Sequence, residues 1–128
     1  MTIRIVRLGS KRIPGEGVRI GTVRRPPRGV LKNDYAKKDW YDVWLPELSP
    51  AADTVKRVLA ANTDPAWLVF ARKYRAEMSR PEPGRLLDLL AALSRTTNFS
   101  VGCYCEDETR CHRSILRVLL TEHGATVE

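Results

Sequence analysis

The stretch NFSVGCYCEDETRCHRSILRVLLTEHG (98–124) decides the fold. Its first nine residues alternate apolar and small or polar side chains, which predicts a buried strand over 98–106 with Phe99, Val101, Cys103 and Cys105 on one face. After the polar turn EDETR, leucine and isoleucine recur at helical spacing, and Gly124 stands where a C-terminal cap belongs. A buried strand, a short turn and a helix are typical of an α/β protein.

Three earlier segments also have the pattern of strands. IRIVRLG (3–9) and VRIGTVRR (18–25) alternate aliphatic residues with arginine, and WYDVWL (40–45) is a short, bulky candidate. Pro26 and Pro27 end the second segment because proline has no N–H to donate to a ladder. The basic segment RRPPRGVLKNDYAKKD that follows is expected to be an irregular loop.

Three helices are predicted between this loop and the last strand. Ser49-Pro50 places an N-cap before proline and opens a helix to about Ala61. Asp64-Pro65 repeats this arrangement and opens a second helix, which runs to the break at Pro81–Pro83. A leucine-rich third helix covers about 84–94. We therefore expect an α/β fold, a small single domain over 1–128 with a mostly parallel sheet flanked by helices.

The composition supports an ordinary globular chain. It has 128 residues, 43% of them hydrophobic and 29% charged, which suits one core. No apolar run approaches the roughly 20 residues that cross a bilayer, and the first residues lack the pattern of a secretory signal. We expect a cytoplasmic protein that does not contact the membrane.

Positive charge is concentrated in the N-terminal third. The net charge is +7, and residues 1–38 hold eleven basic against two acidic side chains. This surplus of nine favours an anionic partner such as a nucleotide, a nucleic acid, another phosphorylated compound or an acidic protein.

All three cysteines lie within nine positions, at 103, 105 and 111. The spacing differs from that of common zinc sites, and in a helix the adjacent Cys111 and His112 would point about 100° apart, so no metal or other cofactor is expected. A Cys105–Cys111 disulfide would be transient in a reducing compartment. Cys103, well inside the strand, is expected to be an inert core residue.

Cys105 and Cys111 differ from Cys103 in their position. Cys105 is near the carboxyl end of a strand, where α/β proteins bind ligands, and Cys111 is expected in the first turn of the next helix. A helix N-terminus attracts anions and favours a thiolate, and His112 and Arg113 add an acid–base group and a clamp for phosphate or carboxylate. The alternatives are a solvated first turn for His112 and Arg113, and inert packing for the thiols.

The box Y-C-E-D-E-T-R-C-H-R resembles the signature of the family known as domain of unknown function 488 (DUF488), with matches at Cys105, Glu106, Cys111, His112 and Arg113. The resemblance continues upstream in VRIGTVRRPPRGV, at Arg24, Arg25, Pro27, Arg28 and Gly29, and in WLPELSP and DPAWLVFARKYRAEM. It implies a compact α/β fold with an anion-binding cleft, and it brings no established reaction.

Together these observations predict a ligand cleft between the RRPPRG loop and the start of the last helix. Phosphate or carboxylate groups would be held by four arginines: Arg24, Arg25, Arg28 and Arg113. If the protein is an enzyme, Cys105 or Cys111 is the candidate nucleophile, with His112 and Glu106 as proton-transfer partners. The alternative is a non-enzymatic basic domain that binds nucleic acid or an acidic protein.

Overall fold

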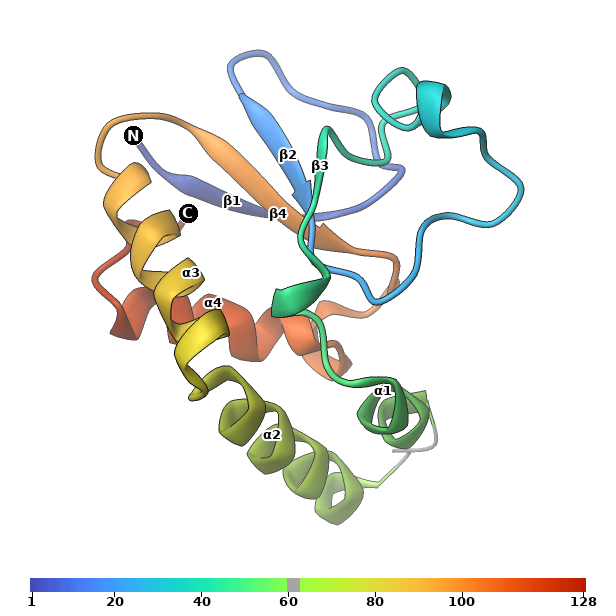
Figure 1. Cartoon of the computed structure of the whole chain (residues 1–128), viewed down its shortest axis with the longest axis vertical. Coiled ribbons are helices and arrows are strands. Elements are labelled where there is room, and N and C mark those ends of the chain that lie inside the picture. The colour runs from blue at the N-terminus through green and yellow to red at the C-terminus, as the bar shows by residue number, and fades with distance from the viewer. Residues whose placement is uncertain (60–62) are drawn as a thin grey trace.

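The computed structural model describes residues 1–59 and 63–128 and has an α/β architecture (Figure 1). Its described part contains a sheet of four strands, in the order β1-β4-β2-β3 with every neighbouring pair parallel. The strands are β1 (Ile3–Arg7), β2 (Val18–Gly21), β3 (Val43–Trp44) and β4 (Phe99–Cys103). The α-helices are α1 (Ala52–Leu59), α2 (Asp64–Met78), α3 (Pro81–Leu93) and α4 (His112–Glu122). The expected α/β fold is confirmed, and the sheet is entirely parallel.

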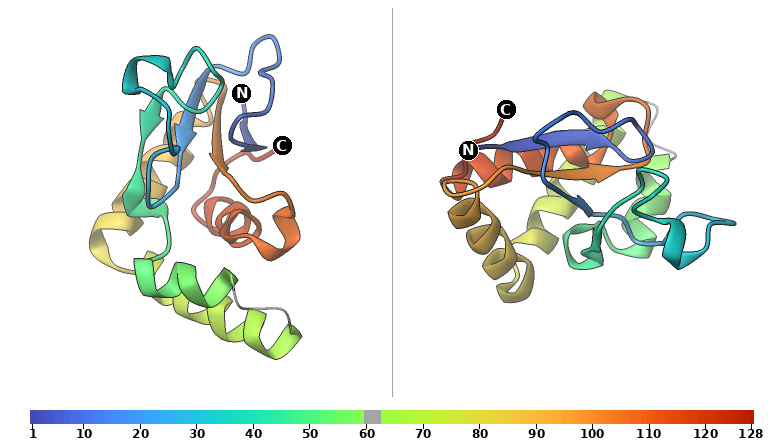
Figure 2. Two further views of the ribbon diagram at one scale, coloured as in Figure 1. Left: turned by 90° about the vertical axis from the view of Figure 1, so that its right-hand side faces the viewer. Right: turned by 90° about the horizontal axis from the view of Figure 1, so that it is seen from above.

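The helices lie together on one side of the sheet, and loops cover the other side (Figures 1 and 2). Strand β4 lies between β1 and β2, so all five of its residues are buried. Val101 is in register with Ile5 on β1 and Ile20 on β2, and these three residues contribute to the core between the sheet and the helices. The helices supply the other part of that core, which includes Phe70, Tyr74, Leu87, Leu90, Leu116 and Leu120.

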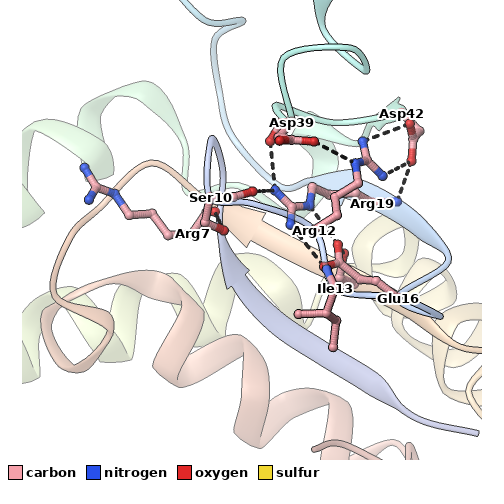
Figure 3. A network of polar contacts seen from close by, with 9 residues as sticks. Arg7, Ser10, Arg12, Ile13, Glu16, Arg19, Asp39 and Asp42 are labelled. Carbon is pink, nitrogen blue, oxygen red and sulfur yellow. Dashed lines mark hydrogen bonds and ion pairs between the residues drawn. The ribbon is translucent and has the colours of Figure 1, made fainter.

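The loop-covered side of the sheet contains a buried polar network around Arg19 (Figure 3). Arg19 has no exposed surface, and its guanidinium binds the Glu16 carboxylate at 2.8 Å and the carbonyl oxygens of Ser10 and Asp39 at 2.7 and 2.8 Å. Ser100 of β4 donates to the same Glu16 oxygen at 2.8 Å. Arg19 is therefore part of the protein interior and is not available to a partner, although it is one of the eleven basic residues counted in 1–38.

Helix α1 begins later than Ser49-Pro50 predicts. Residues Pro46–Leu48 form a 3₁₀ turn that the Ser49 N–H closes on the Pro46 carbonyl at 3.0 Å, so Ser49 ends one turn instead of capping the next. Glu77 of α2 supplies the capping contacts, since it accepts the Ala51 N–H at 2.9 Å and the Thr54 hydroxyl at 2.8 Å. The predicted helix end at Ala61 lies outside the described residues.

The two proline-rich helix starts are also shifted from the prediction. The N-cap of α2 is Thr63 instead of Asp64, and its hydroxyl accepts the Ala66 N–H at 3.3 Å. Helix α2 ends at Met78, just before Pro81 as predicted, but α3 begins at Pro81 instead of near residue 84. Pro81 and Pro83 are tolerated there because the backbone N–H groups of a first helical turn have no partner within the helix.

The strands are shorter than predicted, whereas the end of α4 agrees with the prediction. Strand β2 stops at Gly21 and β4 at Cys103, so Cys105 lies beyond its strand. Gly124 follows α4 with a φ of 91°, the left-handed conformation expected of a C-terminal cap.

Among the described residues, no helix combines the length and the apolar character needed to span a membrane.

Candidate functional site

The sequence-predicted site residues lie in segments that follow the carboxyl ends of three neighbouring strands. Residues after β1, β2 and β4 emerge at one edge because these strands are parallel and adjacent. The arginine loop follows β2, and the segment with Cys105 and Cys111 connects β4 to α4. This is the edge at which open α/β sheets bind ligands.

A cleft of about 680 Å³ is present at this edge. It is lined by Arg7, Leu8, Arg25, Pro26, Pro27, Arg28, Trp40 and Tyr104. The Trp40 and Tyr104 rings meet edge to face with centroids 5.8 Å apart, and the Tyr104 hydroxyl donates to the Arg25 carbonyl at 2.9 Å. The cleft therefore combines a basic rim with an aromatic wall.

Two of the predicted anion-binding arginines carry uncompensated charge in this cleft. Arg25 and Arg28 are exposed, and neither forms an ion pair with any residue in 1–59 or 63–128. Arg7 contacts the exposed Glu106 carboxylate at 3.5 Å and donates to the Tyr104 carbonyl at 3.3 Å. The positive potential of the cleft comes mainly from Arg25 and Arg28.

Arg24 does not line the cleft. Its guanidinium donates to the carbonyl oxygens of Ser49 and Pro50, each at 3.1 Å. These bonds tie the loop after β2 to the segment that enters α1. Arg24 thus binds backbone carbonyls, whereas Arg25 and Arg28 line the cleft.

A compact cluster of thiols and one imidazole lies next to the cleft. The sulfur atoms of Cys103 and Cys105 are 3.8 Å apart, and Cys111 Sγ is 3.8 Å from His112 Nδ1. Candidate ligand atoms of Cys103, Cys111 and His112 all lie within 4.8 Å of one another. Cys111 has no exposed surface and His112 is 6% exposed, so neither is part of the cleft wall.

The backbone at Cys111 explains how neighbouring residues reach one point. Cys111 was expected in the first helical turn, but it is the N-cap of α4 and has an extended conformation, with φ −121° and ψ 151°. The separation of about 100° between successive helical residues therefore does not apply to Cys111 and His112. Cys103, expected to be inert core, is part of this cluster.

His112 is held in a defined orientation. Its Nε2 lies 2.8 Å from the Thr22 carbonyl oxygen, which can only accept, so Nε2 carries the proton. The Tyr74 ring packs edge-on against the imidazole with centroids 5.4 Å apart. In neutral His112, Nδ1 therefore presents its lone pair toward Cys111.

Arg113 is buried, with 4% of its surface exposed, and is not part of a solvated first turn. Its Nη2 donates to the Cys105 carbonyl at 2.6 Å, whereas its Nε has no hydrogen-bond partner among the described residues. Arg113 therefore faces the thiol segment and is separate from Arg25 and Arg28 in the cleft.

The three thiols have different acidities because they contact one another. Hydrogen bonds from Cys103 and Cys105 hold the pKa of Cys111 well below its ordinary value; burial opposes this effect and His112 reinforces it. Hydrogen bonds to Cys105 and Cys111, followed by burial, raise the pKa of Cys103. The Cys103 contact lowers the pKa of Cys105, but the Cys111 contact and burial outweigh it and raise the value. Cys111 is therefore the most acidic of the three thiols.

The predicted residues thus form two neighbouring groups, and Glu106 is outside the thiol group. The Glu106 side chain is 83% exposed and contacts Arg7, so it is not held against any thiol. Leu8, Trp40 and Tyr104 line the cleft and belong to or pack against the same apolar cluster as Cys103 and Cys111. Sequence reasoning missed Arg7, Trp40 and Tyr104 as cleft residues; the positions of Arg7 and Tyr104 directly at or after strand ends were the available signal.

Comparison with known families identifies the chain. The model of a family described as the active DUF488-N3 subclade matches residues 3–124. The match covers almost the whole chain, so this protein belongs to the DUF488 family, as the Cys-Glu and Cys-His-Arg boxes indicated. No curated protein and no solved structure matches it.

Proposed function

We propose that this DUF488 protein binds a phosphorylated ring compound of the nucleotide class in the cleft at the carboxyl edge of its sheet. The observation that carries the proposal is that one cleft is lined by two exposed arginines, Arg25 and Arg28, and by the aromatic rings of Trp40 and Tyr104. Phosphate and base are the two parts of a nucleotide that such a surface can recognise separately.

The arginines suit the phosphate part. A guanidinium presents a planar fork of donors that matches the oxygens of phosphate and binds them in pairs. Because no carboxylate of residues 1–59 or 63–128 pairs with Arg25 or Arg28, a ligand gains their charge without breaking an ion pair there. Arg7 is only weakly engaged by Glu106 at 3.5 Å, so a ligand phosphate can replace this exposed contact.

The aromatic wall suits the base. Trp40 and Tyr104 expose π-surface next to the arginines, and stacking of a base on such rings is worth roughly 1–3 kcal/mol. The volume of about 680 Å³ lies in the range of about 300–1,000 Å³ that is usual for small-ligand sites. A nucleotide therefore fits both the chemistry and the size of the cleft.

The decisive experiment is calorimetric titration of the wild-type protein with a nucleoside diphosphate, the matching nucleoside and inorganic pyrophosphate. We expect the diphosphate to bind more tightly than either part. The double variant Arg25→Gln/Arg28→Gln should lose roughly 10-fold or more in affinity per arginine, because each hydrogen bond to a charged group is worth about 1.5–3 kcal/mol.

The matched control is Arg85→Gln, which makes the same change at an exposed arginine of α3 outside the cleft. It should bind like wild type. An equal loss in Arg85→Gln, or no diphosphate binding by the wild-type protein at any salt concentration, would contradict the proposal.

A single-stranded oligonucleotide tests the alternative of a non-enzymatic nucleic-acid-binding domain. If several phosphates are neutralised along the basic N-terminal third, the logarithm of affinity falls with the logarithm of salt by about 0.7 per phosphate. A steep slope together with weak mononucleotide binding would replace the small-ligand proposal with this one.

The Cys111–His112 contact favours a second candidate, thiol-dependent catalysis on the bound ligand. The imidazole is oriented by Thr22 and faces the sulfur, as a nucleophile–base pair requires. Cys111 is fully buried, however, so Cys105, which is partly exposed, is the sulfur nearer to solvent. The rate of alkylation measured against pH tests this candidate: it is excluded if Cys105 and Cys111 both titrate at or above about 8.5.

A further inference from the structure

We infer that Cys103, Cys105, Cys111 and His112 form a closed tetrahedral site for one Zn²⁺ ion. The inference is independent of the nucleotide proposal, since none of these four residues lines the cleft. It competes with thiol-dependent catalysis, because a sulfur bound in a closed zinc site is not a free nucleophile.

Two separations between the ligand atoms match those expected around a single ion. Zinc lies about 2.3 Å from thiolate sulfur and about 2.0–2.1 Å from imidazole nitrogen, so a tetrahedral angle places two sulfurs roughly 3.8 Å apart and a sulfur and a nitrogen roughly 3.5 Å apart. The observed separations are 3.8 Å for Cys103 Sγ to Cys105 Sγ and 3.8 Å for Cys111 Sγ to His112 Nδ1. The ligand atoms of Cys103, Cys111 and His112 all lie within 4.8 Å of one another. Cys105 lies outside this group of three but contacts Cys103, and it would move toward the ion as the fourth ligand.

The hydrogen bond of His112 is that of a metal ligand. Imidazoles that bind metal usually donate their other N–H to a carbonyl or carboxylate, which fixes the ring orientation. Here Nε2 donates to the Thr22 carbonyl at 2.8 Å, and this leaves Nδ1, the atom that faces the sulfur of Cys111, for the ion.

Arg113 supplies an independent electrostatic argument. A buried guanidinium is costly without a counter-charge, and Arg113 has no ion pair within the described residues and an Nε without a partner. Three thiolates, one neutral imidazole and Zn²⁺ carry a net charge of minus one. Such a centre next to the Cys105 carbonyl, to which Arg113 donates, would balance the buried arginine.

The location of the site indicates a structural role for the ion. Its ligands come from the end of β4, the connection after it and the start of α4, so the ion joins the sheet to the helix that packs beneath it. Four protein ligands fill a tetrahedral zinc ion and leave no position for substrate, which is the arrangement of structural sites. The site would hold the wall formed by Tyr104 and Trp40, both of which pack against the cluster around Cys103 and Cys111.

Metal content and cobalt substitution of the wild-type protein test the inference. Protein purified without chelator, and chelator-treated protein refolded with zinc, should contain about one zinc per chain. Refolding with Co²⁺ should give the intense visible bands of tetrahedral cobalt and a thiolate-to-cobalt charge-transfer band. Failure to bind either ion stoichiometrically after refolding, or an octahedral cobalt spectrum, would overturn the inference.

Variants identify the ligands. Cys111→Ser and His112→Asn should lose zinc or change the cobalt bands, whereas His123→Asn, at the partly exposed histidine after α4, should keep one zinc and the wild-type spectrum. Because a ligand variant can fail to fold, thiol alkylation of the wild-type protein gives a second readout: all three cysteines should be protected until chelator is added. Rapid alkylation of Cys111 in protein that contains zinc would refute the assignment.

The two proposals fail separately. Stoichiometric zinc with no nucleotide binding supports the metal site and contradicts the proposed function. Nucleotide binding by a protein that takes up neither zinc nor cobalt does the reverse.

Discussion

The substitution Glu16→Gln tests the buried network that supports the loop-covered face of the sheet (Figure 3). The Glu16 and Arg19 side chains are 2% and 0% exposed, and their guanidinium and carboxylate meet at 2.8 and 3.1 Å. Glutamine keeps the shape of the side chain but removes its charge. The Arg19 cation then stays buried with only neutral acceptors, among them the Ser10 and Asp39 carbonyls.

Removing one partner of a buried ion pair costs about 3–5 kcal/mol, because the remaining charge is left uncompensated. For a chain of this length, that corresponds to a fall in melting temperature of roughly 10–20 °C. The matched control is Glu122→Gln, where the carboxylate also lies 2.8 Å from an arginine, Arg75, but both side chains are about half exposed. We expect the control to lose no more than about 1 kcal/mol.

Urea unfolding followed by circular dichroism at several pH values measures both effects. Burial alone would raise the pKa of Glu16, but hydrogen bonds from Arg19 and Ser100 and the charge of Arg19 outweigh it and lower the pKa. The stabilisation is therefore present at neutral pH and is lost as the pH falls through the lowered value, so the difference between wild type and Glu16→Gln should narrow in acid. A loss below about 1 kcal/mol at neutral pH, or an equal loss in the control, would refute the reasoning.

Two further predictions concern a glycine and a buried arginine. The urea midpoint of Gly17→Ala should be much lower than that of Gly15→Ala. Both glycines have a positive φ, but only a Cβ at position 17 would meet another residue, 2.0 Å from the Asn98 carbonyl oxygen. Equal urea midpoints for the two variants would contradict this prediction. Arg113→Met should weaken zinc binding roughly 10–100-fold, as is usual when a group that supports the metal ligands is lost. Arg110→Met, at an exposed neighbouring position, should leave zinc affinity unchanged, and competition with a coloured chelator measures both affinities. Unchanged zinc affinity in Arg113→Met would argue against the proposed charge balance.

Local patterns predicted most of the elements. Alternation located β1, β2 and β4, helical spacing located α2, α3 and α4, and Gly124 marked the end of α4. These signals depend on residues within a few positions of one another, so a single sequence contains them. The start of α1 was wrong because its capping contacts come from Glu77, more than twenty positions away.

The site was predictable only as a set of candidates. The basic loop and the Cys-His-Arg box both lie at the carboxyl edge, as the order of strand, loop and helix implied. The sequence could not separate Arg25 and Arg28, in the cleft, from Arg24, which binds backbone carbonyls, because all three share one basic loop. Trp40 also lines the cleft, and its contact with Tyr104 depends on the path of the loop after β2.

The sequence by itself determined the α/β class, the family and the candidate site residues, because periodicity and residue chemistry are local properties. Only the tertiary structure decided which of these residues meet. Parallel pairing of β4 between β1 and β2, and the extended backbone at Cys111, bring Cys103, Cys111 and His112 together, with Cys105 against Cys103, although their spacing argued against a shared site. Burial then distinguishes Arg19 and Arg113, enclosed by the fold, from the exposed Arg25 and Arg28, and this difference sets what each charge can do.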